Sequence, residues 1–180
     1  PNVQSDPERW EWNDPYHRAL ARRGIRLLGI LHGTPPWARP ERKDVKYWAT
    51  NVPTDDPEAW KRYVRETVTH FAGMIEEWEV WNEPNGNAFF SGTPQEYATL
   101  LQHAFTEART ANPNCRIYGL SLSNIREEAQ RFARTVLGEA ADSMDAISYH
   151  AYQAEPPDQR MAERIETLRK IAAEAGRSDM

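Results

Sequence analysis

The residues best suited to chemistry lie in segment 78–85, which reads WEVWNEPN. Its first four residues are bulky and β-favouring, so they predict a short buried strand. Pro84 ends this strand, because proline has no N–H for a sheet ladder and restricts the residue before it to extended geometry. Glu83 is therefore expected where the strand stops, beside the amide of Asn82 and the ring of Trp81. A carboxyl group there suits proton transfer, since an apolar wall favours its protonated form.

The local pattern around Glu83 supports two interpretations. In the first, Glu83 is a general acid/base; in the second, it only caps the strand end or forms a salt bridge. If the strand belongs to a parallel α/β barrel, its carboxyl end lies on the face where active sites are built. The pattern alone leaves both interpretations open.

Two further strand ends carry candidate site residues. The apolar run 25–32 predicts a strand of a parallel sheet covered on both faces, and it ends at His32, shortly before Trp37. Each of these two side chains is either a ligand contact or ordinary packing. Segment 145–152 predicts another strand, with His150 and Tyr152 at its end.

The order of the expected elements indicates an α/β fold. Helices and strands alternate strictly, which favours a parallel sheet with right-handed crossovers. A further strand is expected at 116–122, and residues 1–13 are expected to be loop. Helix starts and stops follow capping signals and glycines. The expected helices run from Asp14 to Arg23, from Asp56 through Ile75, from Thr93 to just before Pro113, over 129–137 with an end at Gly138, and over 165–175 with an end at Gly176.

Composition excludes several classes of function. The chain has 180 residues, a formal charge of −5 and one cysteine, Cys115. The acidic balance gives no sign of a nucleic-acid partner, and no apolar run approaches the ~20 residues of a membrane span. The five histidines are scattered, and no zinc, serine-hydrolase or phosphate-loop motif is present. We therefore expect no metal or other cofactor, and the sequence leaves the compartment open.

The string Trp-Asn-Glu-Pro-Asn at 81–85 resembles the strand-4 motif of clan A glycoside hydrolases. These are retaining (β/α)8 enzymes, and families 39 and 5 look most similar. The resemblance implies that Glu83 is the acid/base, that Asn82 holds the sugar 2-hydroxyl and that the substrate is a carbohydrate. It also implies hydrolysis of β-linked oligo- or polysaccharides by double displacement.

The flanking segments resemble the same clan. Thr34-Pro35-Pro36-Trp37 is similar to the turn after strand 3, and His150-Ala151-Tyr152 is similar to the strand-6 pair beside the nucleophile. The resemblance implies that His150 and Tyr152 orient or tune that nucleophile and that His32 contacts a sugar hydroxyl. Trp37, Trp81 and Trp48 are the candidate stacking surfaces.

The resemblance covers nearly the whole chain but only about half of a TIM barrel. Residues 1–180 map onto strands 3 to 6 of a single catalytic domain, so we expect about four parallel strands with flanking helices, in an internal piece of a larger enzyme. A complete barrel typically needs ~250 residues. The clan's nucleophile, a Glu at the end of strand 7, is expected beyond the C-terminus. Glu155 is the nearest spare carboxylate, but a surface position suits it better.

Two expectations follow from a partial barrel. Its open edges are expected to promote self-association of the isolated chain. The alternative to an enzyme is a non-catalytic carbohydrate-binding or scaffold half-barrel, which would use the same aromatic residues without needing Glu83.

Overall fold

A parallel four-stranded sheet lies at the centre of the computed structural model, which describes residues 4–12, 14–42, 51–150 and 158–180. The strands stand in the order β3-β4-β5-β6, and each neighbouring pair is parallel. This arrangement confirms the predicted α/β fold, a partial TIM barrel. The strands are β3 (Leu27–Leu31), β4 (Ile75–Val80), β5 (Arg116–Leu122) and β6 (Ala146–Tyr149).

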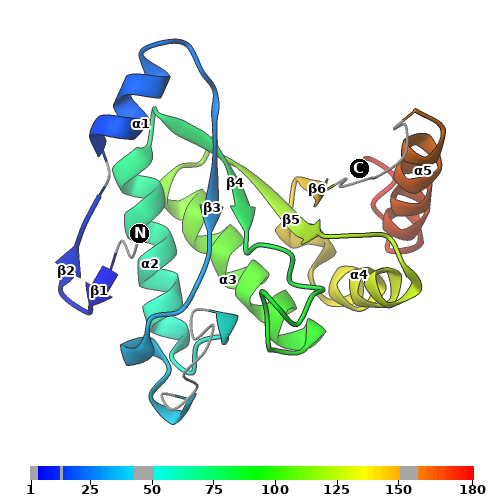
Figure 1. The fold of residues 1–180 in the computed structure, drawn as a ribbon, viewed down its shortest axis with the longest axis horizontal. Helices are drawn as coiled ribbons and strands as arrows, with labels where there is room; N and C mark the ends of the chain where they lie inside the picture. The colour runs from blue at the N-terminus through cyan, green and yellow to red at the C-terminus, as the bar shows by residue number, and fades with distance from the viewer. Residues whose placement is uncertain (1–3, 13, 43–50, 151–157) are drawn as a thin grey trace.

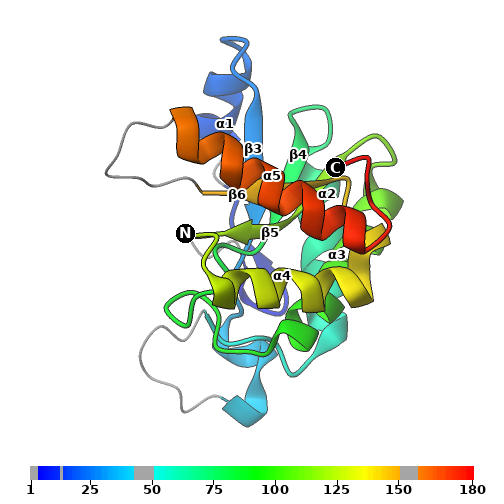
Figure 2. The ribbon, with the colours of Figure 1, turned by 90° about the vertical axis from the view of Figure 1, so that its right-hand side faces the viewer.

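Helices connect the strands and pack in succession along the sheet. Helix α2 contacts α3, α3 contacts α4 and α4 contacts α5, and Figure 1 shows these four helices following one another from left to right. In Figure 2, α4 and α5 lie in front of the strands. The helices are α1 (Asp14–Ala21), α2 (Pro57–Phe71), α3 (Pro94–Ala111), α4 (Glu127–Ala140) and α5 (Asp158–Glu174), with short 3-10 turns η1 (Pro36–Ala38), η2 (Pro40–Arg42) and η4 (Ala141–Ser143).

Two predicted helix starts are confirmed by their capping bonds. The side chain of Asp56 accepts hydrogen bonds from the N–H groups of Glu58 and Ala59 at the start of α2. At α3, Thr93 and Glu96 form a complete capping box, each side chain bonding the other's backbone N–H. Both caps satisfy N–H groups that have no partner inside the helix.

Two predicted helix ends are wrong. Helix α2 ends at Phe71, because Gly73 takes a left-handed φ of 76°, and Ile75 already belongs to β4. The helical spacing of Ile75 with the residues before it is a coincidence of sequence. Helix α4 runs through Gly138 to Ala140, because Gly138 is not among the glycines with positive φ. A glycine ends a helix when it adopts that conformation, and is otherwise tolerated.

The N-terminal segment, predicted as loop, contains a small antiparallel hairpin. It pairs β1 (Gln4–Asp6) with β2 (Arg9–Trp10). The side chain of Asp6 accepts the N–H groups of Glu8 and Arg9 at 2.9 and 3.0 Å, which closes the turn. Such Asx turns form locally, whereas strands this short have little alternation to reveal them.

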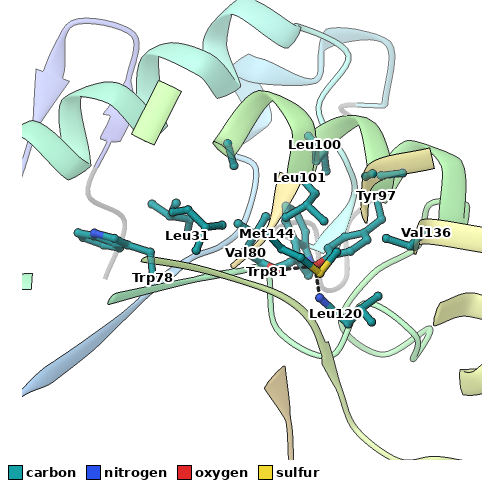
Figure 3. Close-up of a cluster of buried hydrophobic side chains, with 14 of the residues drawn as sticks. Leu31, Trp78, Val80, Trp81, Tyr97, Leu100, Leu101, Leu120, Val136 and Met144 are labelled. Atoms are coloured by element: carbon teal, nitrogen blue, oxygen red, sulfur yellow. Dashed lines mark hydrogen bonds between the residues drawn. The ribbon is translucent and has the colours of Figure 1, made fainter. Parts of the chain in front are cut away.

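The core lies between the sheet and the helices α2, α3 and α4 (Figure 3). Gly29 of β3 lies against the ring of Trp78, and a Cβ at that position would meet the ring carbons at 2.3 Å. The residues on either side of Gly29 point to the opposite face, where Leu28 and Ile30 are about half exposed. One face of the sheet is therefore buried under helices. Within the described ranges, no helix is both long and apolar enough to span a bilayer.

Candidate active site

The candidate site begins where β4 ends. The N–H of Trp81 donates to Leu31 O at 2.8 Å, which carries the β3–β4 pairing one residue further. Trp81 and Glu83 then adopt left-handed φ angles of 66° and 47°. A non-glycine residue in that region costs on the order of 1–3 kcal/mol. The chain therefore turns sharply on both sides of Asn82, and such strain is typical of functional sites.

The ring of Trp81 forms the floor of this turn. It is fully buried, and its indole N–H donates to Phe89 O at 2.7 Å. Its ring centroid lies 4.9 Å from that of His32 and 5.2 Å from that of Phe90, both in edge-on geometry. The sequence predicted a stacking surface for sugar; this burial instead favours a packing role for Trp81.

The loop after β4 is tied to the loop after β5. The amide of Asn85 donates to Ser123 Oγ at 3.1 Å and accepts the Ser123 N–H at 3.0 Å. These bonds fix the last residue of the WNEPN string, so the turn around Glu83 is held on the side away from β3.

His150 is the residue that meets Glu83. Its backbone N–H donates to Leu122 O at 2.8 Å, which continues the pairing of β5 with β6. Its ring nitrogen Nδ1 lies 2.9 Å from Glu83 Oε1. The Glu83 side chain keeps 14% of its surface exposed and that of His150 keeps 19%. The two groups can therefore exchange a proton with each other and still be reached from outside.

Glu79 is a polar member of this cluster that the sequence analysis missed. It lies on β4, and its side chain is only 5% exposed. Its Oε1 accepts the hydroxyl of Ser148 and lies 3.6 Å from His150 Nε2. A signal was present: Glu79 alternates with Trp78 and Val80, so period-2 geometry places a carboxyl on the sheet face opposite the helices.

Tyr97 of α3 is a second residue that the sequence analysis did not single out. Its buried hydroxyl donates to Val80 O and accepts the Leu120 N–H, both at 2.9 Å (Figure 3). It thus bridges β4 and β5 where their paired register has ended. Burial raises the pKa of Tyr97, so the hydroxyl keeps the proton that the bridge needs. Leu120 and the next residue, Ser121, also have left-handed φ, at 70° and 40°.

The other predicted site residues are dispersed. Asn82 is half-buried and makes no hydrogen bond to the residues that the structure describes, so its amide is available to a ligand. His32 and Trp37 line a cavity of about 680 Å³ that Glu83 does not line. Burial lowers the pKa of His32. The indole of Trp37 donates to Gln4 O of the hairpin at 3.3 Å.

Three predicted residues, Tyr152, Trp48 and Glu155, lie outside the described residues. Inside them, no cluster of three or more His, Cys, Asp or Glu side chains could hold a metal ion. The geometry thus brings together Asn82, Glu83 and His150, with Glu79 behind them.

The carboxyl–imidazole pair lies at the carboxyl ends of parallel strands, the face on which α/β barrels carry their active sites. Residues 38–178 match the model of Glycosyl hydrolases family 39. The chain therefore belongs to glycoside hydrolase family 39, which confirms the resemblance read from the WNEPN string. No curated protein matches the chain.

Solved structures share the fold. A monomeric β-xylosidase from Caulobacter crescentus CB15 is 18% identical with a TM-score of 0.72, over 94% of this chain and 39% of its own. A glucosidase from Croceicoccus marinus is 19% identical with a TM-score of 0.67, over 98% and 38%. The family 39 enzyme from Xanthomonas axonopodis pv. citri is 21% identical with a TM-score of 0.65, over 90% and 37%. The chain thus spans less than two fifths of each of these structures.

Proposed function

We propose that Glu83 is the general acid/base of a retaining glycoside hydrolase that cleaves β-linked oligo- or polysaccharides. The observation that carries the proposal is the contact between Glu83 Oε1 and His150 Nδ1 at 2.9 Å, at the carboxyl ends of β4 and β6. It gives the carboxyl a proton-exchanging neighbour on the strand ends where barrels place their chemistry. Family membership supplies the reaction class.

In the first step, Glu83 donates its proton to the glycosidic oxygen while a second carboxylate attacks the anomeric carbon. The aglycone leaves, and a covalent glycosyl–enzyme forms. In the second step, Glu83, now a carboxylate, takes a proton from a water whose oxygen attacks the anomeric carbon. The bond to the second carboxylate breaks, the sugar is released, and Glu83 is left protonated again. Asn82 hydrogen-bonds the sugar hydroxyl next to the reacting carbon, and Tyr152 and His32 are further candidate contacts.

The nucleophile is proposed to come from a Glu outside residues 1–180. A retaining pair needs two carboxyls ~5–5.5 Å apart, both reaching the sugar. Glu79 shares His150 with Glu83, but it is buried within the sheet and bonded to Ser148, which suits a supporting role. Glu155, which lies outside the described residues, remains a weaker candidate.

The proposed substrates are taken from the named activities of similar solved structures. A β-xylosidase and a glucosidase are among the solved structures with this fold, so aryl β-xylosides and β-glucosides are the first substrates to try. Mannosides and arabinosides complete the panel, because the motif itself does not select the sugar.

The test compares Glu83→Gln with wild type and with Glu77→Gln, a carboxylate on the same strand. In a polypeptide that includes the remaining strands, Glu83→Gln is expected to lower turnover of aryl glycosides with poor leaving groups by ~10²–10⁴-fold. Azide should restore turnover of activated aryl glycosides, and Glu77→Gln should retain activity. Equal activity of Glu83→Gln and wild type would refute the role of Glu83.

The 180-residue chain alone separates two further possibilities. We expect no turnover from it, because the nucleophile lies elsewhere. Turnover that depends on Glu83 would place the nucleophile inside the chain. Binding of sugar by the 180-residue chain, with no turnover even when the remaining strands are added, would favour a non-catalytic carbohydrate-binding role for this half-barrel.

We also propose that the isolated chain self-associates. Within the described residues β3 and β6 are the outer strands of the sheet, and Leu28 and Ile30 are about half exposed on its helix-free face. Unpaired edges beside apolar surface favour pairing between chains. Light scattering during size-exclusion chromatography should report masses above one chain, and a monomer at high concentration would contradict the proposal.

A further inference from the structure

Glu79 is a buried carboxylate for which the two-carboxylate mechanism has no use. Its Oε1 atom accepts the Ser148 hydroxyl from β6 and faces His150 Nε2 at 3.6 Å. The opposite ring nitrogen of the same imidazole, Nδ1, lies 2.9 Å from Glu83 Oε1. Three side chains thus form a row, Glu79, His150 and Glu83, in which the imidazole is the middle member.

Burying a carboxylate is energetically unfavourable unless a hydrogen-bond donor or a cation lies beside it. Ser148 supplies one hydrogen-bond donor, and an N–H on His150 Nε2, 3.6 Å from Glu79 Oε1, would add an electrostatic contact that is longer than a hydrogen bond. In a neutral imidazole one nitrogen carries the proton and the other accepts, so the group at one nitrogen decides what the other offers. A carboxylate facing Nε2 therefore favours the form with the proton on Nε2.

We propose that Glu79 is a positioning residue that selects the Nε2–H tautomer of His150 and thereby presents the Nδ1 lone pair to Glu83. In the acid form of Glu83 that the proposed first step requires, Oε1 donates its proton to Nδ1 across the 2.9 Å contact. That proton stays on Oε1 until the oxygen of a departing sugar takes it, which leaves Glu83 as a carboxylate. Ser148 supports the arrangement, because its hydroxyl holds Glu79 Oε1 in front of the ring.

The inference rests on the proposed role of Glu83 as general acid/base, but the experiment that tests it does not measure turnover. Nitrogen-15 NMR of the imidazole rings distinguishes a protonated ring nitrogen from a bare one. The experiment uses the 180-residue chain near neutral pH, with the signals of His150 assigned by their loss in His150→Gln. The matched variants are Glu79→Gln and Glu77→Gln, which remove one charge each from the same strand.

We expect wild-type His150 to show a protonated Nε2 and a bare Nδ1. In Glu79→Gln the ratio of the Nε2–H to the Nδ1–H form should fall roughly fivefold, because a charge-assisted contact becomes a neutral one. In Glu77→Gln the ratio should not change.

Several results would overturn the inference. A wild-type spectrum with the proton on Nδ1, or with both nitrogens protonated, does so without any variant, even if Glu79→Gln fails to fold. An unchanged ratio in Glu79→Gln, or an equal change in Glu77→Gln, does so as well. The activity of Glu83→Gln, whether lost or retained, tests the proposed function only. The tautomer ratio of His150 is measured independently of it.

Discussion

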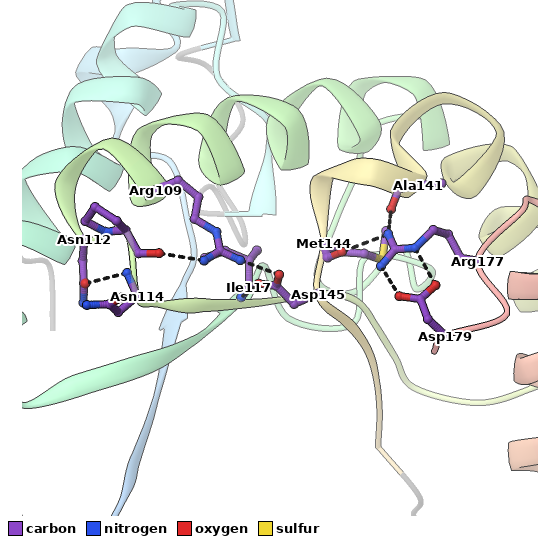
Figure 4. A network of polar contacts seen from close by, with 10 residues as sticks. Arg109, Asn112, Asn114, Ile117, Ala141, Met144, Asp145, Arg177 and Asp179 are labelled. Carbon is purple, nitrogen blue, oxygen red and sulfur yellow. Dashed lines mark hydrogen bonds and ion pairs between the residues drawn. The ribbon is translucent and has the colours of Figure 1, made fainter.

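The two ends of the parallel sheet are built in opposite ways. At the carboxyl ends of β4 and β5, four non-glycine residues have left-handed φ angles, and the polar side chains include a carboxyl and an imidazole that reach solvent. At the amino ends, charged side chains bond one another and the backbone around the start of β6 (Figure 4). The carboxyl ends thus contain strained backbone, whereas the amino ends contain a network of hydrogen bonds and ion pairs.

The amino-end network is centred on Asp145. One carboxylate oxygen pairs with Arg109 of α3, and the other accepts the Ile117 N–H of β5 at 2.7 Å. Nearby, Arg177 donates to Met144 O at 3.1 Å and pairs with Asp179 through two contacts of 2.9 Å. These bonds join α3, β5, the segment before β6 and the segment after α5.

The difference follows the division of labour expected of an α/β barrel. Groups at the carboxyl ends of its strands perform chemistry, and groups at the amino ends stabilise the fold. We therefore expect substitutions at the amino end to lower stability without changing the Glu83–His150 pair. Substitutions at the carboxyl end should change that pair for a smaller loss of stability.

The largest stability effect is expected from Asp145→Ala. It leaves the Ile117 N–H and the Arg109 guanidinium without an acceptor, and the half-exposed setting moderates the cost to about 2–3 kcal/mol. Urea unfolding measures this loss, and the imidazole signals of His150 should stay in place. Asp142→Ala, at an exposed acidic residue of η4, is the control and should change stability by less than about 0.5 kcal/mol. A displaced His150 signal in Asp145→Ala would break the separation of the two ends.

Tyr97→Phe tests a hydrogen-bonded bridge at the carboxyl end of the sheet. The hydroxyl bridges Val80 O and the Leu120 N–H, so its loss leaves two buried backbone groups unpaired and should cost about 2 kcal/mol. Because Val80 precedes the turn that carries Glu83, we also expect the His150 signals to shift.

The control for this bridge is Tyr118→Phe. The Tyr118 hydroxyl makes no hydrogen bond within the described part of the chain, so the change should be nearly neutral. A loss of stability in Tyr97→Phe without any shift at His150 would assign Tyr97 to the fold alone.

The sequence predicted what depends on neighbours in the chain. The caps at Asp56 and Thr93 use partners within three residues. A strand before Pro84 was also predicted, but β4 ends at Val80, and Glu83 is left-handed rather than extended as the proline had suggested. Alternation of helices and strands was enough for the parallel sheet. Gly138 misled the prediction because a glycine allows a helix end without requiring one.

Contacts between segments far apart in the chain could not be predicted from the sequence. Ser148 meets Glu79 across 69 positions, and Leu120 meets the Tyr97 hydroxyl across 23. Each depends on the register between strands, which a single sequence does not specify. The placement of Glu83 and His150 after strands could therefore be predicted, whereas the contacts of Glu79 and Tyr97 could not.

The capping box at the start of α3, which belongs to neither end of the sheet, gives a stability change for comparison. Thr93→Ala removes the acceptor for the Glu96 N–H and should cost about 1 kcal/mol. Thr99→Ala, on the exposed side of the same helix, removes only a bond to Gln95 O and should be neutral or slightly stabilising, since alanine is the better helix former. Similar losses of stability in both variants would show that the capping box does not stabilise the helix. The losses measured at the two sheet ends could then not be compared with a capping bond of known size.

The smallest effect concerns the pH dependence of the amino end. The hydrogen bonds from Arg177 hold the pKa of Asp179 below its ordinary value of 3.8. A carboxyl whose pKa is lowered on folding contributes stability above its unfolded pKa and loses it as the pH falls through the folded value. Wild type should therefore be slightly more stable than Asp179→Asn near neutral pH, and the difference should begin to shrink below about pH 4. Urea unfolding from pH 3 to 7 measures the difference, which should shrink in high salt because Asp179 is exposed. A difference that does not shrink between pH 4 and pH 3 would mean that the side chain acts through packing rather than through its charge.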